Sequence, residues 1–293
     1  MILEQYLADR SALVDKALGR YLPKAAMKPA TLHKAMRYSL FAGGKRLRPI
    51  LALAAAEACG GSIDAALPHA CAVECIHTYS LIHDDLPCMD DDDLRRGRPT
   101  NHKVFGEGIA VLAGDALLTI GFELLSHAKP TRHYDMTTLI RELSTAAGHQ
   151  WLIAGQVLDL EGEGKPTSAR DLKFIHRSKT AALLTASIRL GAMSANASAA
   201  KLEALTEFGQ ALGLAFQVID DILDVTQTSE KLGKSAGKDV AAQKATYPAV
   251  FGLERSRAEA RRLTAAARTA VKPFGKASAP LLALADYLLN RDY

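Results

Sequence analysis

The chain has 293 residues, and the 48% that are hydrophobic suffice for a sizeable core. Its 36 basic and 32 acidic residues leave a formal charge of +4, too small to indicate a nucleic-acid partner. Four cysteines without a CxxC pair predict free thiols, and the opening MILEQYLADR lacks the features of a signal peptide, so we expect a cytoplasmic location.

Helical periodicity dominates the chain, whereas alternating β-branched runs are scarce. Asp115 interrupts the most apolar stretch, so we expect no membrane span. No linker is long enough to separate two units, which predicts one all-α domain over 1–293. The expected helices are 2–21, 31–41, 47–59, 66–85, 108–127, 134–157, 169–194, 199–225, 240–270 and 276–290.

An acidic cluster follows the fourth expected helix, in YSLIHDDLPCMDDDDLRRGRP (79–99). A solvated loop is the usual fate of such a run and fits the later aspartates well. It fits Asp84 and Asp85 poorly, because they close an otherwise apolar helix. Pro87 should turn the chain, which would let Asp90 fold back toward Asp84. Carboxylates at a helix end, followed by arginines that bind phosphate bidentately, suit a magnesium–diphosphate site.

A second acidic cluster lies within an apolar helix, in GLAFQVIDDILD (213–224). Gln217, either Asp220 or Asp221, and Asp224 share one helical face. The stripe could simply be exposed, but buried aspartates need partners because an uncompensated buried charge is costly. Two acidic helices that face each other across a cavity and share Mg²⁺ would satisfy both clusters.

Basic and polar residues outside these clusters offer phosphate contacts. The segment GGKRLRP (43–49) ends a helix with two glycines and lacks P-loop spacing. His77 shares the acidic face of its helix, although a lone helical histidine is usually structural. Lys179 and Thr180 lie within an expected helix, where a lysine can also extend to the surface. Lys234 and Lys244 flank a glycine-containing loop after the second cluster.

Together these motifs resemble the trans-isoprenyl diphosphate synthases. The first cluster is similar to the DDxxxxD motif of that family and the second to its DDxxD motif with a preceding FQ. Other blocks match in order over about residues 35–250, namely GGKRLRP, ECIH, RRGRPTNH, GDALLT, GQVLDL and HRSKT. The resemblance implies a bundle of mostly antiparallel helices around a deep cavity, and usually a homodimer.

The resemblance also implies residue roles. Asp84, Asp90 and Asp220 would ligate three magnesium ions, with Asp224 and Asp85 close by. The allylic diphosphate would be held by Arg95, Lys179, Thr180, Gln217, Lys234 and Lys244. Isopentenyl diphosphate would be held by Lys45, Arg48, His77 and Arg96. Close bacterial relatives often end in a basic residue, whereas this chain ends in NRDY.

The implied reaction condenses isopentenyl diphosphate with dimethylallyl and geranyl diphosphate. Asp84, Asp90, Asp220, Lys179 and Thr180 would carry the catalysis. Tyr79, next to Ser80 and five residues before Asp84, should block growth of the chain. With the Pro87-Cys88 insertion, it resembles enzymes that stop at (2E,6E)-farnesyl diphosphate. Tyr79 could instead be a core residue that never meets the product.

Other functions were weighed against this one. A geranyl or geranylgeranyl diphosphate synthase differs only in product length. A terpene cyclase would not need an isopentenyl site, so Lys45, Arg48 and His77 argue against it. A non-catalytic synthase subunit typically loses aspartates, and both clusters are intact here.

Overall fold

The structure, a computed structural model, describes residues 2–165, 167–226 and 246–289. Its first half contains α1 (Leu3–Tyr21), α2 (Ala30–Leu40), α3 (Leu47–Ala58), α4 (Ile63–Asp84), β1 (Leu94–Arg95), β2 (Arg98–Pro99), α5 (Asn101–Phe105), α6 (Glu107–Ser126) and α7 (Met136–Ala147). The second half contains α8 (Leu152–Glu161), α9 (Ala169–Ile175), the π-helix η1 (His176–Ala181), α10 (Ala182–Ser194), α11 (Ala199–Thr226), α14 (Tyr247–Phe251), α15 (Leu253–Ala270), the 3₁₀-helix η2 (Lys272–Ser278) and α16 (Ala279–Leu289).

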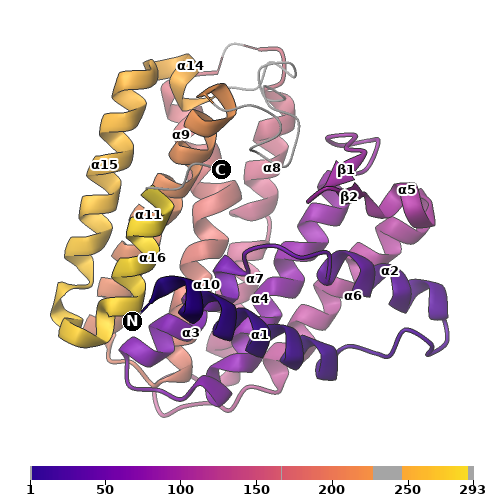
Figure 1. Cartoon of the computed structure of the whole chain (residues 1–293), viewed down its shortest axis with the longest axis horizontal. Coiled ribbons are helices and arrows are strands. Elements are labelled where there is room, and N and C mark those ends of the chain that lie inside the picture. The colour runs from indigo at the N-terminus through magenta and orange to yellow at the C-terminus, as the bar shows by residue number, and fades with distance from the viewer. Residues whose placement is uncertain (1, 166, 227–245, 290–293) are drawn as a thin grey trace.

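These helices form the predicted all-α bundle, in which most neighbours run antiparallel (Figure 1). The helix α4 lies at its centre and packs against α3, α6 and α10. Its apolar residues occur all around the helix rather than on one stripe, which is the pattern of a fully surrounded helix. The helix α11 packs between α10 and α15, so α4 and α11 line the same interior.

The prediction of one helix over 134–157 is wrong, because the segment forms two helices, α7 and α8, with a non-helical connection between them. Gly148 adopts an extended conformation with ψ of −164°, and Trp151 leaves the helical region with ψ of −92°. The predicted helix 240–270 begins outside the described residues, and Gly252 at φ 81° separates α14 from α15. The helix α4 begins at Ile63, three residues before the predicted start at 66, and contains Pro68.

The predicted helix 169–194 is continuous but changes its winding at η1, between α9 and α10. Two glycines let neighbouring helices approach this turn closely. A Cβ at Gly155 of α8 would lie 2.4 Å from the Lys179 backbone nitrogen, and one at Gly213 of α11 would lie 2.6 Å from the Ala181 Cα. The segment η1 is therefore clamped between α8 and α11, and π-turns of this kind are frequent at functional sites.

A short hairpin follows the first acidic cluster, where the sequence predicted only a loop. Arg95 pairs with Arg98 across an antiparallel ladder, and Arg96 and Gly97 both have positive φ, of 54° and 72°. Positive φ at both central residues matches the twist of a two-residue hairpin. The hairpin projects beside α5 (Figure 1).

Among the described residues, only α6 is long and apolar enough to cross a membrane, by length and composition alone. Core helices of soluble proteins meet the same criterion, and α6 buries Ala113, Leu117 and Leu124 in the bundle. This single helix is therefore weak support for a span.

Candidate active site

A cavity of about 1590 Å³ lies among α4, α6, α8, η1 and α11. Charged and polar side chains make up one part of its wall, and apolar side chains such as Leu118, Ile153, Leu160 and Phe216 line another part. The structure brings together in this wall most of the residues that the sequence singled out, namely Arg48, His77, Tyr79, Ser80, Asp84, Arg95, Arg96, Lys179, Thr180, Gln217 and Asp220.

The first acidic cluster turns back on α4 as predicted. The Asp90 backbone N–H donates to the Asp84 carbonyl at 2.8 Å, which closes the turn after the helix. Burial, and then the nearby Asp90 charge, raise the pKa of Asp84 to about 6, although Lys179 opposes the shift. A buried carboxylate held near a second one favours a cation that would neutralise both.

Asp85 points away from this cavity and is only 3% exposed. Its carboxylate accepts hydrogen bonds from Nε and Nη2 of Arg95, the former at 3.0 Å. Arg95 also donates to Asp92 at 3.3 Å. Asp85 therefore anchors Arg95 at the cavity wall.

The second cluster divides in the same way. Asp220 lines the cavity, whereas Asp221 and Asp224 are 3% and 4% exposed and do not line it. The Asp221 carboxylate accepts from Gln217 Nε2 at 2.9 Å and from the Tyr247 backbone N–H at 2.7 Å, and lies 3.3 Å from His176 Nε2. The sequence left Asp220 and Asp221 as alternatives, and the structure places Asp220 at the cavity.

Lys179 and Thr180 of η1 also line the cavity. Lys179 Nζ donates to Asp159 of α8 at 2.6 Å, and Thr180 Oγ1 donates to Gln217 Oε1 at 2.7 Å. Since Asp221 holds the Gln217 amide nitrogen, the amide oxygen is directed to Thr180. Oxygen and ammonium groups are thus fixed beside the carboxylates.

A basic group lies at the α3 end of the cavity. Arg48 Nη1 is 3.2 Å from His77 Nε2. Burial, followed by the charges of Arg48 and Arg96, lowers the pKa of His77 well below its usual value. The imidazole is therefore neutral, and the guanidinium groups supply the positive charge for an anion. Arg96 also donates to the Gly43 carbonyl, which ties the hairpin to the segment before α3.

Several predicted site residues lie elsewhere. Lys45 does not line the cavity, and its Nζ lies 5.7 Å from the centre of the Tyr287 ring. Asp90 is not among the residues that line the cavity, although its backbone N–H bonds the Asp84 carbonyl. Lys234, Lys244 and the NRDY end fall outside the described residues.

Comparison with known proteins identifies the chain. The family described as Polyprenyl synthetase matches residues 29–277. The chain belongs to the polyprenyl synthetase family. A relative from Arabidopsis thaliana, the chloroplastic heterodimeric geranylgeranyl pyrophosphate synthase large subunit 1, is 52% identical over 98% of this chain and 78% of its own length.

Solved structures place the polyprenyl synthetase fold over nearly the whole chain. An FPP/GFPP synthase from Zymomonas mobilis is 35% identical, with a TM-score of 0.88 and 98% of each chain covered. A geranyltransferase from Legionella pneumophila is 31% identical, also with a TM-score of 0.88, covering 99% of this chain and 97% of its own. The all-α bundle expected from the sequence is thereby confirmed.

The side chains that line the cavity of this polyprenyl synthetase are of the type that binds magnesium. The donors at the cavity are carboxylate oxygens, and Mg²⁺ prefers oxygen ligands together with water and substrate phosphate. Within the described ranges, no three histidine, cysteine or carboxylate side chains form a ready-made metal site. The raised pKa of Asp84 fits a group that a cation would stabilise in its ionised form.

One supporting residue, Asp159 of α8, was missed at the sequence level, although GQVLDL places this one acid in an apolar turn of helix. Asp221 was named only as an alternative to Asp220, and its role in orienting Gln217 carried no sequence signal. Neighbouring aspartates look alike until the helix is placed.

Proposed function

We propose that this protein joins isopentenyl diphosphate head to tail with dimethylallyl and geranyl diphosphate, and that it stops at (2E,6E)-farnesyl diphosphate. One observation carries the proposal: Asp84 of α4 and Asp220 of α11 line one cavity together with Arg48, Arg95 and Lys179, while apolar side chains from α6, α8 and α11 line another part of its wall. Two separate carboxylates suit metal-bound diphosphate, the cations suit phosphate oxygens, and the apolar wall suits a prenyl chain.

The residues divide the work by position. Asp84, Asp90 and Asp220 would hold Mg²⁺, which when bound stabilises negative charge on the departing diphosphate. Arg95 and Lys179 would bind the allylic diphosphate, and their charges favour breaking of its carbon–oxygen bond. The Thr180 and Gln217 oxygens face the cavity and would stabilise the allylic cation.

The second substrate would bind at the basic end. Arg48 and Arg96, beside neutral His77, are placed for isopentenyl diphosphate. Its double bond would attack the allylic carbon, and the proton lost from the adduct would pass to the released diphosphate. The apolar walls exclude water, which would otherwise capture the cation.

A direct assay tests this function. Purified protein is incubated with isopentenyl and dimethylallyl diphosphates, with Mg²⁺ or with chelator, and the dephosphorylated products are separated by chromatography. Elongated alcohols that require both substrates and metal support the proposal. Turnover of a single allylic substrate to a cyclic product, or no turnover by the chain alone, would contradict it.

Product length rests on Tyr79, which is 7% exposed and lines the cavity. Its ring lies edge-on to His83 at 5.7 Å, one turn from Asp84. The Arabidopsis relative is named for the longer geranylgeranyl product, so a substitution of Tyr79 is the decisive test of product length. Tyr79→Ala should lengthen the product by at least one isoprene unit, whereas Tyr21→Ala, remote from the cavity, should not. If Tyr79→Ala still gives farnesol alone, another residue limits growth.

We also infer a homodimer in the cytoplasm. Leu112 of α6 is 54% exposed, and Ile153 and Val157 of α8 are 46% and 47% exposed although they line the cavity. A second copy over these side chains would remove apolar surface from water. Light scattering of the pure protein should give twice the chain mass; a monomer would refute the inference.

A further inference from the structure

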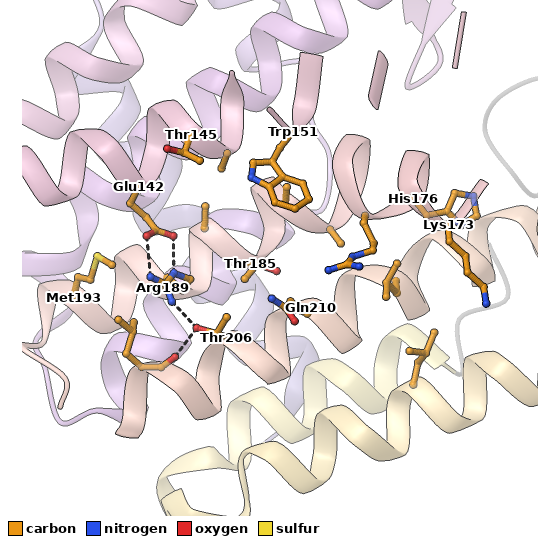
Figure 2. Close-up of a pocket in the computed structure, with 18 of the residues that line it drawn as sticks. Glu142, Thr145, Trp151, Lys173, His176, Thr185, Arg189, Met193, Thr206 and Gln210 are labelled. Carbon is orange, nitrogen blue, oxygen red and sulfur yellow. Dashed lines mark hydrogen bonds and ion pairs between the residues drawn. The ribbon is translucent and has the colours of Figure 1, made fainter. Parts of the chain in front are cut away.

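A second cavity, of about 680 Å³, lies on the other side of η1 and α11 from the candidate active site. The helices α7, α10 and α15 and the residues before α8 complete its wall. Its middle is apolar and includes Trp151, Ala182, Leu214 and Val218. Figure 2 shows Trp151 on one side of this space, with the Glu142–Arg189 pair at one end and Lys173 at the other.

The charge of this wall is positive. Its lining includes five cationic residues, Arg141, Lys173, Arg177, Arg189 and Arg262, and two carboxylates, Glu142 and Glu259. Both carboxylates are already paired: Arg189 donates twice to Glu142, at 2.6 and 3.0 Å, and Arg262 donates twice to Glu259, each at 2.7 Å. Five cations minus two anions leave a surplus of three positive charges that attracts an anion.

The surplus is concentrated at the end formed by α9 and η1. Lys173 and Arg177 are four residues apart there, and the Lys173 Nζ lies 5.5 Å from the centre of the Phe251 ring. Two lining side chains that are more than nine-tenths buried also carry polar atoms without a hydrogen-bond partner among the described residues, Thr185 Oγ1 and His176 Nδ1. Buried polar atoms of this kind indicate room for a ligand with polar groups.

We propose that this second cavity is an effector site for a single-chain amphiphile with a phosphate head, the head lying between Lys173 and Arg177 and the chain along Trp151, Leu214 and Val218. The charge surplus selects an anion, and the apolar middle selects a hydrocarbon tail. Because no lining carboxylate is left unpaired to hold a metal, binding here needs no divalent cation, in contrast to the active site.

The cavity is coupled to the candidate active site through hydrogen bonds. His176 lines the second cavity, and its Nε2 lies 3.3 Å from the Asp221 carboxylate. This carboxylate accepts a hydrogen bond from the Gln217 amide nitrogen, and the Gln217 amide oxygen accepts one from the Thr180 hydroxyl. Gln217 and Thr180 line the first cavity. An occupant that moves His176 would therefore shift Thr180, and on the function proposed above it would change the rate of prenyl transfer.

The test uses Trp151, the only tryptophan of the chain, as a local reporter. Dodecyl phosphate, below its micelle concentration, is titrated into the full chain in the presence of EDTA while tryptophan fluorescence is recorded. We expect a saturable change with dodecyl phosphate but none with dodecanol. Lys173→Gln or Arg177→Gln should weaken binding by about tenfold. Arg255→Gln, an exposed charge on α15 outside the lining, should leave it unchanged.

Other results would overturn the proposal. The absence of a saturable change would show that dodecyl phosphate does not bind beside Trp151. An equal response to dodecanol would show that the phosphate head is not recognised. Binding that Arg48→Gln abolishes while Lys173→Gln does not would place the amphiphile in the candidate active site. In a parallel assay, dodecyl phosphate should change the initial rate of prenyl transfer by wild type but not by Lys173→Gln. Because the fluorescence titration needs no turnover, absence of enzyme activity would refute the proposed function without touching the binding result.

Discussion

The two aspartate pairs, Asp84–Asp85 at the end of α4 and Asp220–Asp221 in α11, have the same arrangement on different helices. In each pair the first carboxylate lines the cavity and the second is buried beside it. Asp85 anchors Arg95, and Asp221 orients Gln217. Successive helical residues point about 100° apart, so one pair can place one carboxylate at the cavity and the other beside a residue that it holds in position. The two aspartates of each pair therefore have different roles, one at the cavity and one in the support of a neighbouring side chain.

The largest difference between the cavity-lining and the buried aspartates should appear in kcat. Asp84→Asn and Asp220→Asn each remove a carboxylate from the cavity, and we expect kcat to fall by about a thousandfold or more because the leaving-group charge loses its metal. Steady-state assays with saturating Mg²⁺ check this. Loss of less than tenfold in both variants would exclude the metal role.

A smaller effect is expected at Asp221. Gln217 and the Tyr247 backbone donate to different oxygens of Asp221, and an asparagine keeps an acceptor at only one of these two positions, so one of the donors loses its partner. We expect kcat to fall by about 10- to 100-fold and the free energy of unfolding to fall by about 1–3 kcal/mol. Chemical denaturation together with kinetics measures both. A wild-type kcat would show that Asp221 does not position Gln217 for the reaction, and wild-type stability would show that its hydrogen bonds do not stabilise the fold.

The metal-free protein should reveal the cost of Asp84. Its pKa of about 6, against an ordinary value of 3.8, means that ionisation costs stability above about pH 6 and none below about pH 4. Asp84→Asn should therefore be more stable than wild type by about 1–3 kcal/mol in EDTA at pH 7.5, with the difference vanishing toward pH 4. Urea titrations at both pH values give the comparison, and an unchanged gap would refute it.

The smallest effect should follow Asp85→Asn. Both Arg95 hydrogen bonds go to the same oxygen, Oδ1 of Asp85, so an amide oxygen can still accept them, and the guanidinium loses only the opposing charge. We expect the KM for the allylic substrate to rise a few-fold, with kcat within about threefold of wild type. Asp92→Asn, a weaker partner of Arg95, is the control and should change less. A fall in kcat as large as that of Asp84→Asn would contradict the different roles of Asp84 and Asp85.

Sequence patterns could predict the helices and the convergence of the two clusters because both depend on periodicity. Asp90 folds back on Asp84 as the Pro87 turn requires. Patterns could not show the π-turn at η1, because it arises from the approach of α8 and α11 rather than from local preference. The break at Trp151 and the outward position of Lys45 likewise depend on packing between distant segments.

The clamp on η1 also sets where this protein can be redesigned. Gly155 and Gly213 leave no room for even a methyl group against the η1 backbone, so changes there would displace Lys179 and Thr180 together. Tyr79, Leu118 and Ile153, by contrast, line the cavity from α4, α6 and α8. Libraries that aim at new product sizes should diversify these three positions and leave both glycines untouched.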